Sequence, residues 1–397
     1  MISRDETILK EDSVSAGRML EYGNLCDELH IVVLSKRKIT RDITQNRVKK
    51  LSDNVFVYPT NSWLKIFSIF TAYRLGKKII GNWKLEIGNC IVTSQDPFET
   101  GLVGLWLKKK FRIGLNIQIH GDFFGNPYWL NESFLNKIRL KIANRVIPNA
   151  DSIRVVSERI KNSLKSYNFH SKAGPLRQES RVIGPWAENL KSKIVVAPIF
   201  TDIQKIQETE PKFDLHKRYP DSDLILLWVG KMSRVKNLLF LLRAFKYILE
   251  AFPKAVLVLV GDGPEEARLK DEAKKLGIID FVKFEGAQTD LISYYKTADV
   301  FVFPSLYEGW GRVVIEAAAA GLPIVMSDVG CAGEVIQDGV SGRVVKVNDL
   351  EGFVRAITEL GFNLDLREKY AHAALEKIKT LPNKEETFRL IKESWFI

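Results

Sequence analysis

The stretch Tyr307–Ala317, with the sequence YEGWGRVVIEA, carries the strongest fold signal in this chain. Before it, the apolar run Val300–Phe303 predicts a buried strand, which a Pro-Ser pair ends. After it, the small-residue segment Val313–Ala320 predicts a helix closed by Gly321. Glycine at a strand-to-helix turn lets backbone N–H groups approach an anion, and the first turn of a helix carries about half a positive charge. The stretch therefore predicts a diphosphate-binding turn in an α/β domain.

Two glutamates flank this turn, Glu308 and Glu316, with seven residues between them. A helix that begins near Gly311 places Glu316 more than one turn inside, on the buried side, whereas Glu308 lies on the preceding loop. One carboxylate can then accept hydrogen bonds from hydroxyls at one end of a ligand and the other from hydroxyls at its far end, with phosphates between them. This is the outline of a nucleotide sugar. The alternative is a loop glutamate and a helix-surface glutamate without a ligand, which is the commoner case for two glutamates at arbitrary positions.

The longer stretch YEGWGRVVIEAAAAGLPIV, residues 307–325, resembles the signature of retaining glycosyltransferases of the family 4 type. The resemblance is strong from Leu224 to about Gly342 and weak elsewhere. It implies the GT-B fold, an α/β fold of two Rossmann-like domains, each with a doubly wound parallel sheet, that face each other across a cleft. It also implies a nucleoside-diphosphate sugar as co-substrate and no other cofactor.

Length and composition exclude several classes of protein. A chain of 397 residues is long enough for two domains, each with its own core. No apolar run approaches the ~20 residues of a membrane span, and the polar start MISRDETILKEDS lacks the pattern of a secretory signal. The widely spaced Cys26, Cys90 and Cys331 have no metal-ligand spacing and predict reduced thiols. We expect a cytoplasmic protein that is either soluble or peripheral at the inner face of the plasma membrane.

The net charge of +11 is divided unevenly. Residues 1–200 contain 32 Lys and Arg against 18 Asp and Glu, whereas residues 201–397 contain 27 against 30. A basic first half predicts an anionic surface as partner, either lipid headgroups or nucleic acid. Two aromatic and basic segments, residues 61–84 and 105–113, can lie in a headgroup layer, although core-packing helices with a solvated basic edge would show the same pattern. No nucleic-acid recognition motif accompanies the charge, so we expect no nucleic acid as partner.

Alternating strand and helix patterns in the first half predict a mainly parallel sheet with helices on both faces. The expected strands are residues 30–34, 55–58, 89–92, 115–119, 152–156 and 194–197, and the expected helices are residues 16–26, 63–80, 98–109, 132–143 and 158–166. Residues 170–193 depart from the pattern and predict a loop insertion.

The sequence divides into three parts. Residues 1–200 form the expected acceptor-side domain, whose first strand is short or missing. Residues 201–382 form the expected nucleotide-sugar-binding domain. The amphipathic stretch 383–397 predicts a terminal helix that packs back on the first domain, as the resemblance implies.

His120 ends an expected strand and is followed by a glycine and an aromatic-rich loop. It would project from the carboxyl edge of the sheet, where open α/β sheets bind ligands. A lone histidine is more often structural. This position and the resemblance nevertheless favour contact with the sugar or the acceptor.

The second domain opens with a buried strand, Leu224–Val229, then Gly230 and a basic loop. Lys231 and Lys236 flank the exit of that strand and the start of the next helix, where two cations can meet a diphosphate; two surface lysines are the alternative. In the family that the chain resembles, an arginine stands at the position of Lys231, so the charge is kept but bidentate geometry is lost.

Two further turns follow in this domain. The turn GDGP, residues 261–264, lacks the third glycine of a dinucleotide fingerprint and predicts a backbone contribution to the pocket. As the resemblance implies, Gly286, after the next strand, would place main-chain groups at the base of the nucleotide.

From the residues and the resemblance together, we infer the transfer of a sugar from a nucleoside diphosphate to a hydroxyl, with the anomeric configuration kept, in cell-surface polysaccharide or glycolipid synthesis. Cations and amides fixed around the leaving diphosphate would stabilise its developing charge. The expected catalytic residues are Lys231, Lys236, Glu308 and His120, and the expected donor-binding residues are Gly230, Gly286, Gly309, Trp310, Gly311, Arg312 and Glu316. We expect no metal, because the only Asp-x-Asp, Asp221–Asp223, precedes a strand and so lies at the wrong end of the sheet.

Other functions share part of this pattern. A nucleotide-sugar epimerase could use the same fold and donor pocket, and would convert the donor without an acceptor. A glucan phosphorylase needs a much longer chain and a pyridoxal-binding lysine, which we cannot place. A non-catalytic sugar-binding protein is consistent with a short first strand and with Lys231 in place of arginine.

Overall fold

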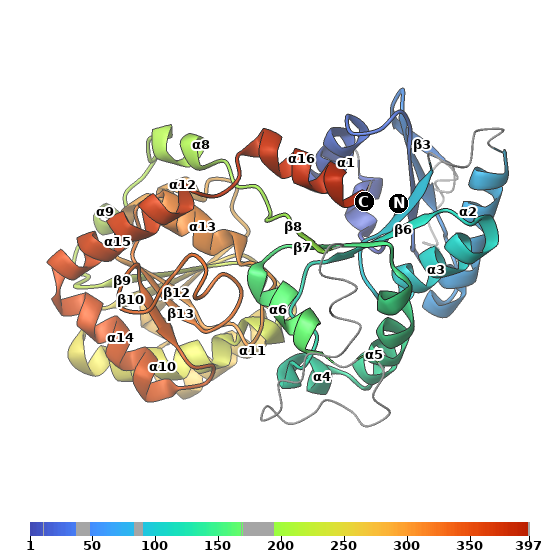
Figure 1. Ribbon diagram of the computed structural model, residues 1–397. Coiled ribbons are helices and arrows are strands. Elements are labelled where there is room, and N and C mark those ends of the chain that lie inside the picture. Colours follow the sequence, from blue (N-terminus) through green and yellow to red (C-terminus); the bar gives the residue numbers. More distant parts are fainter. Residues whose placement is uncertain (11, 37–47, 83–89, 168, 170–193, 396–397) are drawn as a thin grey trace. The chain divides into compact units, whose positions relative to one another are not determined.

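The computed structural model describes residues 1–10, 12–36, 48–82, 90–167, 169 and 194–395. The chain forms two compact units (Figure 1). Unit 1 contains Met1–Ala197 and Glu385–Ile397, and unit 2 contains Pro198–Lys384. The expected loop insertion at residues 170–193 lies outside the described residues.

Unit 1 is built on an eight-stranded sheet whose order is β3-β4-β2-β1-β5-β6-β7-β8. All neighbours pair in parallel except β3, which pairs with β4 in antiparallel fashion at the edge. The strands are β1 (Ile2–Ser3), β2 (Leu29–Val33), β3 (Lys49–Ser52), β4 (Val55–Pro59), β5 (Ile91–Ser94), β6 (Gly114–Ile119), β7 (Ser152–Val155) and β8 (Ile194–Val196). The expected sheet is therefore present, and β3 is a strand that the sequence analysis did not include.

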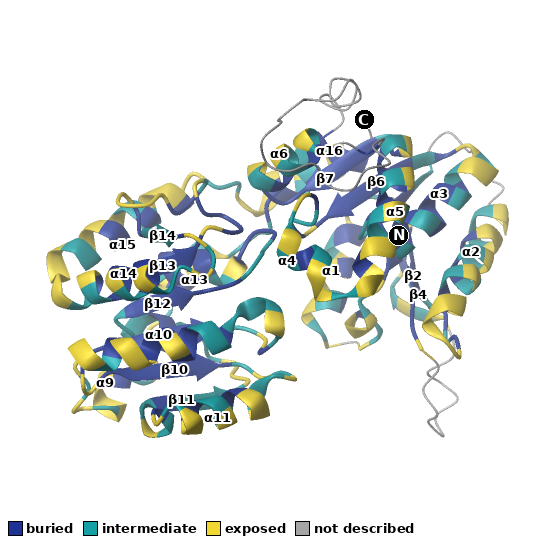
Figure 2. Cartoon of the chain, turned by 90° about the horizontal axis from the view of Figure 1, so that it is seen from below, coloured by how far each residue is buried: buried dark blue, intermediate teal, exposed yellow. Residues whose placement is uncertain are grey.

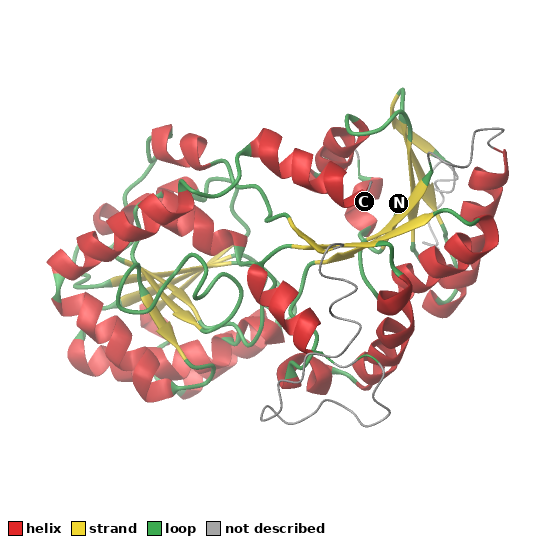
Figure 3. Ribbon diagram, viewed as in Figure 1, coloured by secondary structure: helices red, strands yellow, loops and turns green. Residues whose placement is uncertain are grey.

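Helices cover both faces of the unit 1 sheet (Figure 3). They are α1 (Val14–Gly23), α2 (Lys65–Asn82), α3 (Glu99–Phe111), α4 (Pro127–Glu132), α5 (Phe134–Val146), α6 (Glu158–Ser166) and α16 (Lys384–Trp395), with 3-10 turns η1 (Glu6–Leu9) and η4 (Ile147–Asn149).

The single helix expected at residues 132–143 is wrong, because two helices meet at Ser133. Ser133 has extended backbone angles, and its hydroxyl accepts the Leu135 N–H at 3.2 Å, which starts α5 afresh.

Unit 2 contains a six-stranded parallel sheet whose order is β11-β10-β9-β12-β13-β14. Its strands are β9 (Ile225–Val229), β10 (Val256–Val260), β11 (Val282–Gly286), β12 (Val300–Phe303), β13 (Ile324–Ser327) and β14 (Arg343–Val345). Every residue of β9, β10, β12 and β13 is buried. Figure 2 shows these strands in dark blue, with the exposed residues on the outer sides of the helices. Continuous Val, Ile and Leu runs are what parallel strands covered on both faces require.

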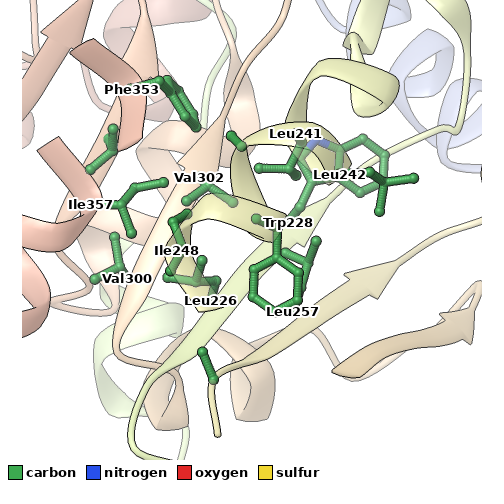
Figure 4. Packing of buried hydrophobic residues seen from close by; sticks show 14 of the residues in the cluster. Leu226, Trp228, Leu241, Leu242, Ile248, Leu257, Val300, Val302, Phe353 and Ile357 are labelled. Atoms are coloured by element: carbon green, nitrogen blue, oxygen red, sulfur yellow. The ribbon is translucent and has the colours of Figure 1, made fainter. Parts of the chain in front are cut away.

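The unit 2 core lies between this sheet and its helices. Leu226, Trp228 and Leu257 from the sheet pack with Leu241 and Ile248 from α10 (Figure 4). The helices are α8 (Ile203–Glu208), α9 (Leu215–Arg218), α10 (Leu238–Ala251), α11 (Glu266–Lys275), α12 (Ile292–Thr297), α13 (Arg312–Ala319), α14 (Leu350–Phe362) and α15 (Leu364–Ile378), with 3-10 turns η6 (Arg234–Lys236) and η7 (Ile279–Phe281).

The last helix, α16, lies in unit 1. Trp395 is buried, and its ring meets the ring of Tyr22 edge to face at 6.0 Å. The carbonyl of Ser394 accepts hydrogen bonds from Asn116 on β6 at 2.8 Å and from Ser152 on β7 at 2.5 Å. Helix α16 is therefore fixed against the unit 1 sheet through both apolar and polar contacts.

None of the helices within the described residues combines the length and the apolar character needed to cross a membrane.

Candidate functional site

The strand order reverses once in each sheet. In unit 1 the reversal lies between β1 and β5, and in unit 2 it lies between β9 and β12. Open α/β sheets bind ligands outside the carboxyl ends of the strands beside such a point. In unit 2 this edge is formed by the loops that follow β9 and β12.

The loop after β12 makes the sharp turn that begins α13. Gly311 precedes the helix with a φ of +88°, a conformation that a residue with a Cβ rarely adopts. A Cβ on Gly330 of the neighbouring loop would lie 2.6 Å from the Trp310 carbonyl oxygen, which accepts the Cys331 N–H at 2.9 Å. Close packing with that loop thus fixes the turn. Arg312 begins the helix, whose first N–H groups lack intrahelical acceptors, as in any helix.

Glu308 and Lys236 come together at this edge although 72 residues separate them. Lys236 Nζ donates to Glu308 Oε1, and the two side chains are only 20% and 16% exposed. The same ammonium lies 5.5 Å from the centroid of the Phe303 ring. The Leu306 N–H donates to the Val235 carbonyl at 2.9 Å and so joins the two loops. The pair places one cation and one carboxylate beside the start of α13.

Glu316 is only 7% exposed and lies on the buried side of α13. Arg312 Nε donates to its Oε1 at 2.8 Å, and the Tyr295 hydroxyl donates to its Oε2 at 3.0 Å. Burial and the Glu316 carboxylate raise the pKa of Tyr295 well above its ordinary value, so the phenol stays protonated and remains a donor. Each carboxylate oxygen still has acceptor capacity for a ligand hydroxyl.

Tyr295 is a residue that the sequence analysis missed. It lies on the short helix α12, and only the fold brings it to Glu316. No spacing within the sequence connects the two residues.

Lys231 is not part of the same cluster. It follows Gly230 at the end of β9, and its side chain is exposed. The structure therefore joins Lys236, but not Lys231, to Glu308.

The GDGP turn packs directly on the loop after β9. A Cβ on Gly261 would lie 1.8 Å from the Gly230 carbonyl oxygen, and one on Gly263 would lie 2.3 Å from the Met232 carbonyl oxygen. The Met232 N–H donates to the Asp262 carbonyl at 2.6 Å. These glycines are required because two backbones touch there.

Gly286 ends β11, and its carbonyl accepts the Gly261 N–H at 2.7 Å. The preceding residue, Glu285, is held by Arg218 at 2.9 Å and by the hydroxyl groups of Tyr219 at 3.1 Å and Tyr294 at 2.7 Å. Burial and the Glu285 carboxylate raise the pKa of Tyr294 to about 12. This cluster fixes the backbone at the end of β11, where the sequence analysis placed the base.

Trp310 and Gly309 lie inside the turn rather than on its surface. The Trp310 ring is 2% exposed, and its indole N–H has no hydrogen-bond partner among the described residues. Trp310 therefore supports the turn by packing, and a direct contact with a ligand would involve its backbone.

In unit 1, His120 follows β6 at the carboxyl edge of the sheet. Its Nε2 lies 3.2 Å from Gln118 Oε1, and its side chain reaches solvent. Desolvation by the surrounding protein lowers the pKa of His120 to about 3, and the guanidinium groups of Arg154 and Arg18 contribute to this shift. The imidazole is therefore neutral at pH 7.

The loop after β5 is organised by Asp96, which the sequence analysis did not single out. Its Oδ1 accepts the N–H groups of Phe98 at 2.8 Å and Thr100 at 3.3 Å at the start of α3. Burial raises the pKa of this carboxyl. Phe98 stacks on Trp129 at 5.3 Å, which ties this loop to the one after His120.

Within the described residues, no group of three or more His, Cys, Asp and Glu side chains is placed to hold a metal ion. Asp223 lies before β9, at the amino end of the sheet, and its carboxylate accepts the Lys254 N–H at 3.4 Å.

Comparisons with known proteins agree on the family. Residues 211–377 match the family model described as Glycosyl transferases group 1. An uncharacterised glycosyltransferase of Methanocaldococcus jannaschii is 29% identical over 77% of this chain and 77% of its own length. The alpha-monoglucosyldiacylglycerol synthase of Streptococcus pneumoniae is 26% identical over 64% of this chain and 55% of its own length. Three of the curated relatives are matched over about half of their own length, between 45% and 57%.

Among solved structures, Anabaena HepE in complex with UDP-glucose matches with a TM-score of 0.69 and 16% identity, over 99% of this chain and 98% of that one. The likeness shows the GT-B fold. The prediction of two doubly wound parallel-sheet domains of this fold is therefore confirmed.

Proposed function

We propose that the chain transfers a sugar from a nucleoside diphosphate to a hydroxyl acceptor with retention of the anomeric configuration, because residues 211–377 match the model of the glycosyl transferases group 1 family. The reaction separates charge, because the sugar becomes oxocarbenium-like while the leaving diphosphate gains negative charge. Fixed cations and amide dipoles stabilise such a state without reorganising.

The observation that supports this proposal most is the grouping of Lys236, Glu308 and the start of α13 at one edge of the unit 2 sheet. Lys236 and the first amides of α13 carry the positive charge that a diphosphate needs. Glu308 is the acceptor for sugar hydroxyls. When a diphosphate binds, Lys236 exchanges part of its contact with Glu308 for a phosphate oxygen.

Glu316 is the proposed acceptor for the ribose hydroxyls. Arg312 donates to one oxygen of its carboxylate and the Tyr295 hydroxyl donates to the other, so both oxygens are oriented. The backbone at Gly286, held through Glu285, is the proposed contact for the base. The proposed reaction uses no metal, since Lys236 and the helix amides supply the positive charge.

We place the acceptor in a lipid layer because of an exposed apolar surface on unit 1. At the start of α2, Trp63 is 81%, Ile66 63%, Phe67 53% and Phe70 52% exposed. Lys65 is exposed between them, and Arg74, Lys77 and Lys78 are exposed farther along the helix. Rings beside basic side chains suit an anionic membrane surface, and we propose a peripheral cytoplasmic enzyme of glycolipid or polysaccharide synthesis.

Not all of the expected interfacial sequence takes part. In the stretch 105–113, Leu105, Leu107 and Ile113 are buried and belong to the core. Residues 83 and 84 lie outside the described residues. The proposed membrane surface is therefore Trp63 together with the exposed residues of α2 up to Lys78.

The test is a transfer assay that contains UDP-glucose or another nucleotide sugar, with bacterial lipid extract as acceptor. Sugar appearing in the lipid fraction supports transfer, and nuclear magnetic resonance of the product reports its anomeric configuration. Conversion of the donor when no acceptor is present would indicate an epimerase. Tight nucleotide binding without any product, across a panel of donors and acceptors, would indicate a binding protein.

Vesicle sedimentation tests the membrane surface separately. Binding to phosphatidylglycerol vesicles should weaken as salt rises, and Phe67→Ser should weaken it further at low salt. Tyr247→Ser, on α10 in unit 2, is the matched control, because this aromatic side chain is 49% exposed. Equal sedimentation of all three proteins would argue against α2 as the contact surface.

A further inference from the structure

One face of the unit 1 sheet carries a row of buried polar side chains. Asn116, Gln118 and His120 share this face, because alternate residues of a strand point to the same side. The neighbouring strands add Thr93, opposite Asn116, and Arg154, opposite Gln118. Apart from His120, these side chains are at most 4% exposed, so their hydrogen bonds must be made within the protein.

The two ends of this row fix the direction of every hydrogen bond in it. At one end, Arg154 Nη1 donates to Gln118 Oε1 at 3.3 Å, and a guanidinium has no acceptor. At the other end, the main-chain carbonyl of Ser394 on α16 accepts from Asn116 Nδ2 at 2.8 Å, and a carbonyl cannot donate.

The links between these ends follow the same direction. Gln118 Nε2 donates to Thr93 Oγ1 at 2.9 Å, and the Thr93 hydroxyl donates to Asn116 Oδ1 at 2.9 Å. Turning the Gln118 amide over would place its NH2 group against Arg154. Turning the Asn116 amide over would place its oxygen against the Ser394 carbonyl. Both amides therefore have one orientation.

His120 is the branch of this chain that reaches solvent. Its Nε2 lies 3.2 Å from Gln118 Oε1, an oxygen that can only accept. We infer that the buried chain from Arg154 to Ser394 holds His120 as the Nε2–H tautomer, with Nδ1 as a hydrogen-bond acceptor. Gln118 is thus a positioning residue for His120.

The surroundings of the ring agree with this tautomer. Nδ1 has no hydrogen-bond partner among the described residues, and the side chain is exposed. The low pKa of His120 excludes the imidazolium form near pH 7, in which both nitrogens would donate.

The consequence for ligands rests on the proposed function. A group that meets Nδ1 must donate a hydrogen, so it is a hydroxyl of the sugar or the acceptor and not a phosphate oxygen.

Nitrogen-15 spectroscopy of the ligand-free full-length protein tests the tautomer without any assumption about function. The protein contains five histidines, and the signals that disappear in the His120→Gln variant are those of His120. At pH 7 we expect a protonated, pyrrole-like Nε2 and an unprotonated, pyridine-like Nδ1. A protonated Nδ1 on the neutral ring, or two protonated nitrogens, would overturn the inference.

Thr93→Val tests whether the chain sets the tautomer. Valine removes the link between the two amides, so Gln118 is free to reorient and the His120 signals should shift toward a mixture of tautomers. Thr60→Val is the matched control, because Thr60 is 6% exposed and its hydroxyl makes two hydrogen bonds with Ser35 outside this chain. Unchanged His120 signals in Thr93→Val would remove the chain as the cause. If that variant does not fold, the wild-type spectrum alone still decides the tautomer.

Binding of UDP-glucose and its monodeoxy analogues tests the ligand side. One deoxy analogue should bind the wild type at least ten-fold more weakly than UDP-glucose, and the difference should disappear in His120→Phe. If neither UDP-glucose nor any analogue binds, and the Nε2–H tautomer is observed, the proposed donor site is refuted and the inferred tautomer stands. Equal binding of UDP-glucose and all its analogues by the wild type would refute a contact with a hydroxyl of the donor sugar.

Discussion

The two candidate binding edges differ in how their polar groups are held. In unit 2, Glu308, Arg312 and Glu316 belong to one short stretch, and a glycine inside that stretch makes the turn. In unit 1, His120 depends on side chains from three strands and on a carbonyl of the last helix. A local motif supplies most of the polar groups of the first edge, and Lys236 and Tyr295 join it only through the fold. A hydrogen-bond chain across a sheet holds the second edge. The comparison teaches that two edges of similar topology can draw their polar groups from one segment or from several strands.

The largest expected effect is at the unit 2 edge. Lys236→Ala should lower kcat by about 10²–10³-fold, since it removes a fixed cation from the leaving group. Initial rates with UDP-glucose and lipid acceptor measure this. Lys231→Ala is the comparison, because Lys231 is exposed and apart from Glu308. The decrease in kcat of Lys231→Ala should be smaller, and equal decreases in the two variants would contradict a special role for the Lys236–Glu308 pair.

The two glutamates should separate into different kinetic effects. Glu316→Gln should weaken UDP binding by about 10-fold or more, because a hydrogen bond to a charged group contributes about 1.5–3 kcal/mol. Glu308→Gln should leave UDP binding nearly unchanged and lower kcat with the sugar donor. Isothermal titration with UDP and steady-state rates distinguish the two. Near-wild-type behaviour of both variants would refute these roles.

At the unit 1 edge, the expected effect is on the free energy of unfolding. Asn116→Ala leaves the Thr93 hydroxyl and the Ser394 carbonyl each without one partner, at a cost of about 1–3 kcal/mol. Chemical denaturation followed by circular dichroism measures the change. Asn149→Ala is the control, because Asn149 is exposed and its side chain donates to the nearby Arg145 carbonyl, so its change should be within about 0.5 kcal/mol. A similar loss of stability in the two variants would show that the hydrogen-bond chain contributes little to the free energy of unfolding.

The smallest expected effect concerns pH. The pKa of His120 falls from 6.5 to about 3 on folding, so the folded state binds fewer protons than the unfolded state in this window. The contribution is fully present above pH 6.5 and is lost as the pH falls toward 3. His120→Gln should therefore lose stability less steeply than the wild type on acidification. Thermal unfolding at a series of pH values measures this, and parallel curves would contradict it. The exposure of the side chain keeps the difference small.

Much of the fold follows from the sequence alone. The apolar run at Val300–Phe303 is a strand as predicted, since a parallel strand covered on both faces is apolar at every position. Helix α6 has the predicted bounds, Glu158–Ser166, because Ser157 caps it with a hydrogen bond to the Ile160 N–H. The start of α5 was missed, because the cap at Ser133 interrupts a stretch whose apolar pattern continues.

The sequence by itself determined the turn at Gly311 and the two glutamates beside it, because backbone conformation and spacing within one helix are local properties. Tertiary structure alone decided that Lys236 pairs with Glu308, that Tyr295 reaches Glu316, and that Arg154 and Thr93 fix the amide of Gln118. Each of these contacts joins different elements of the sheet or its helices. Strand order and register set such distances, and no single segment encodes them.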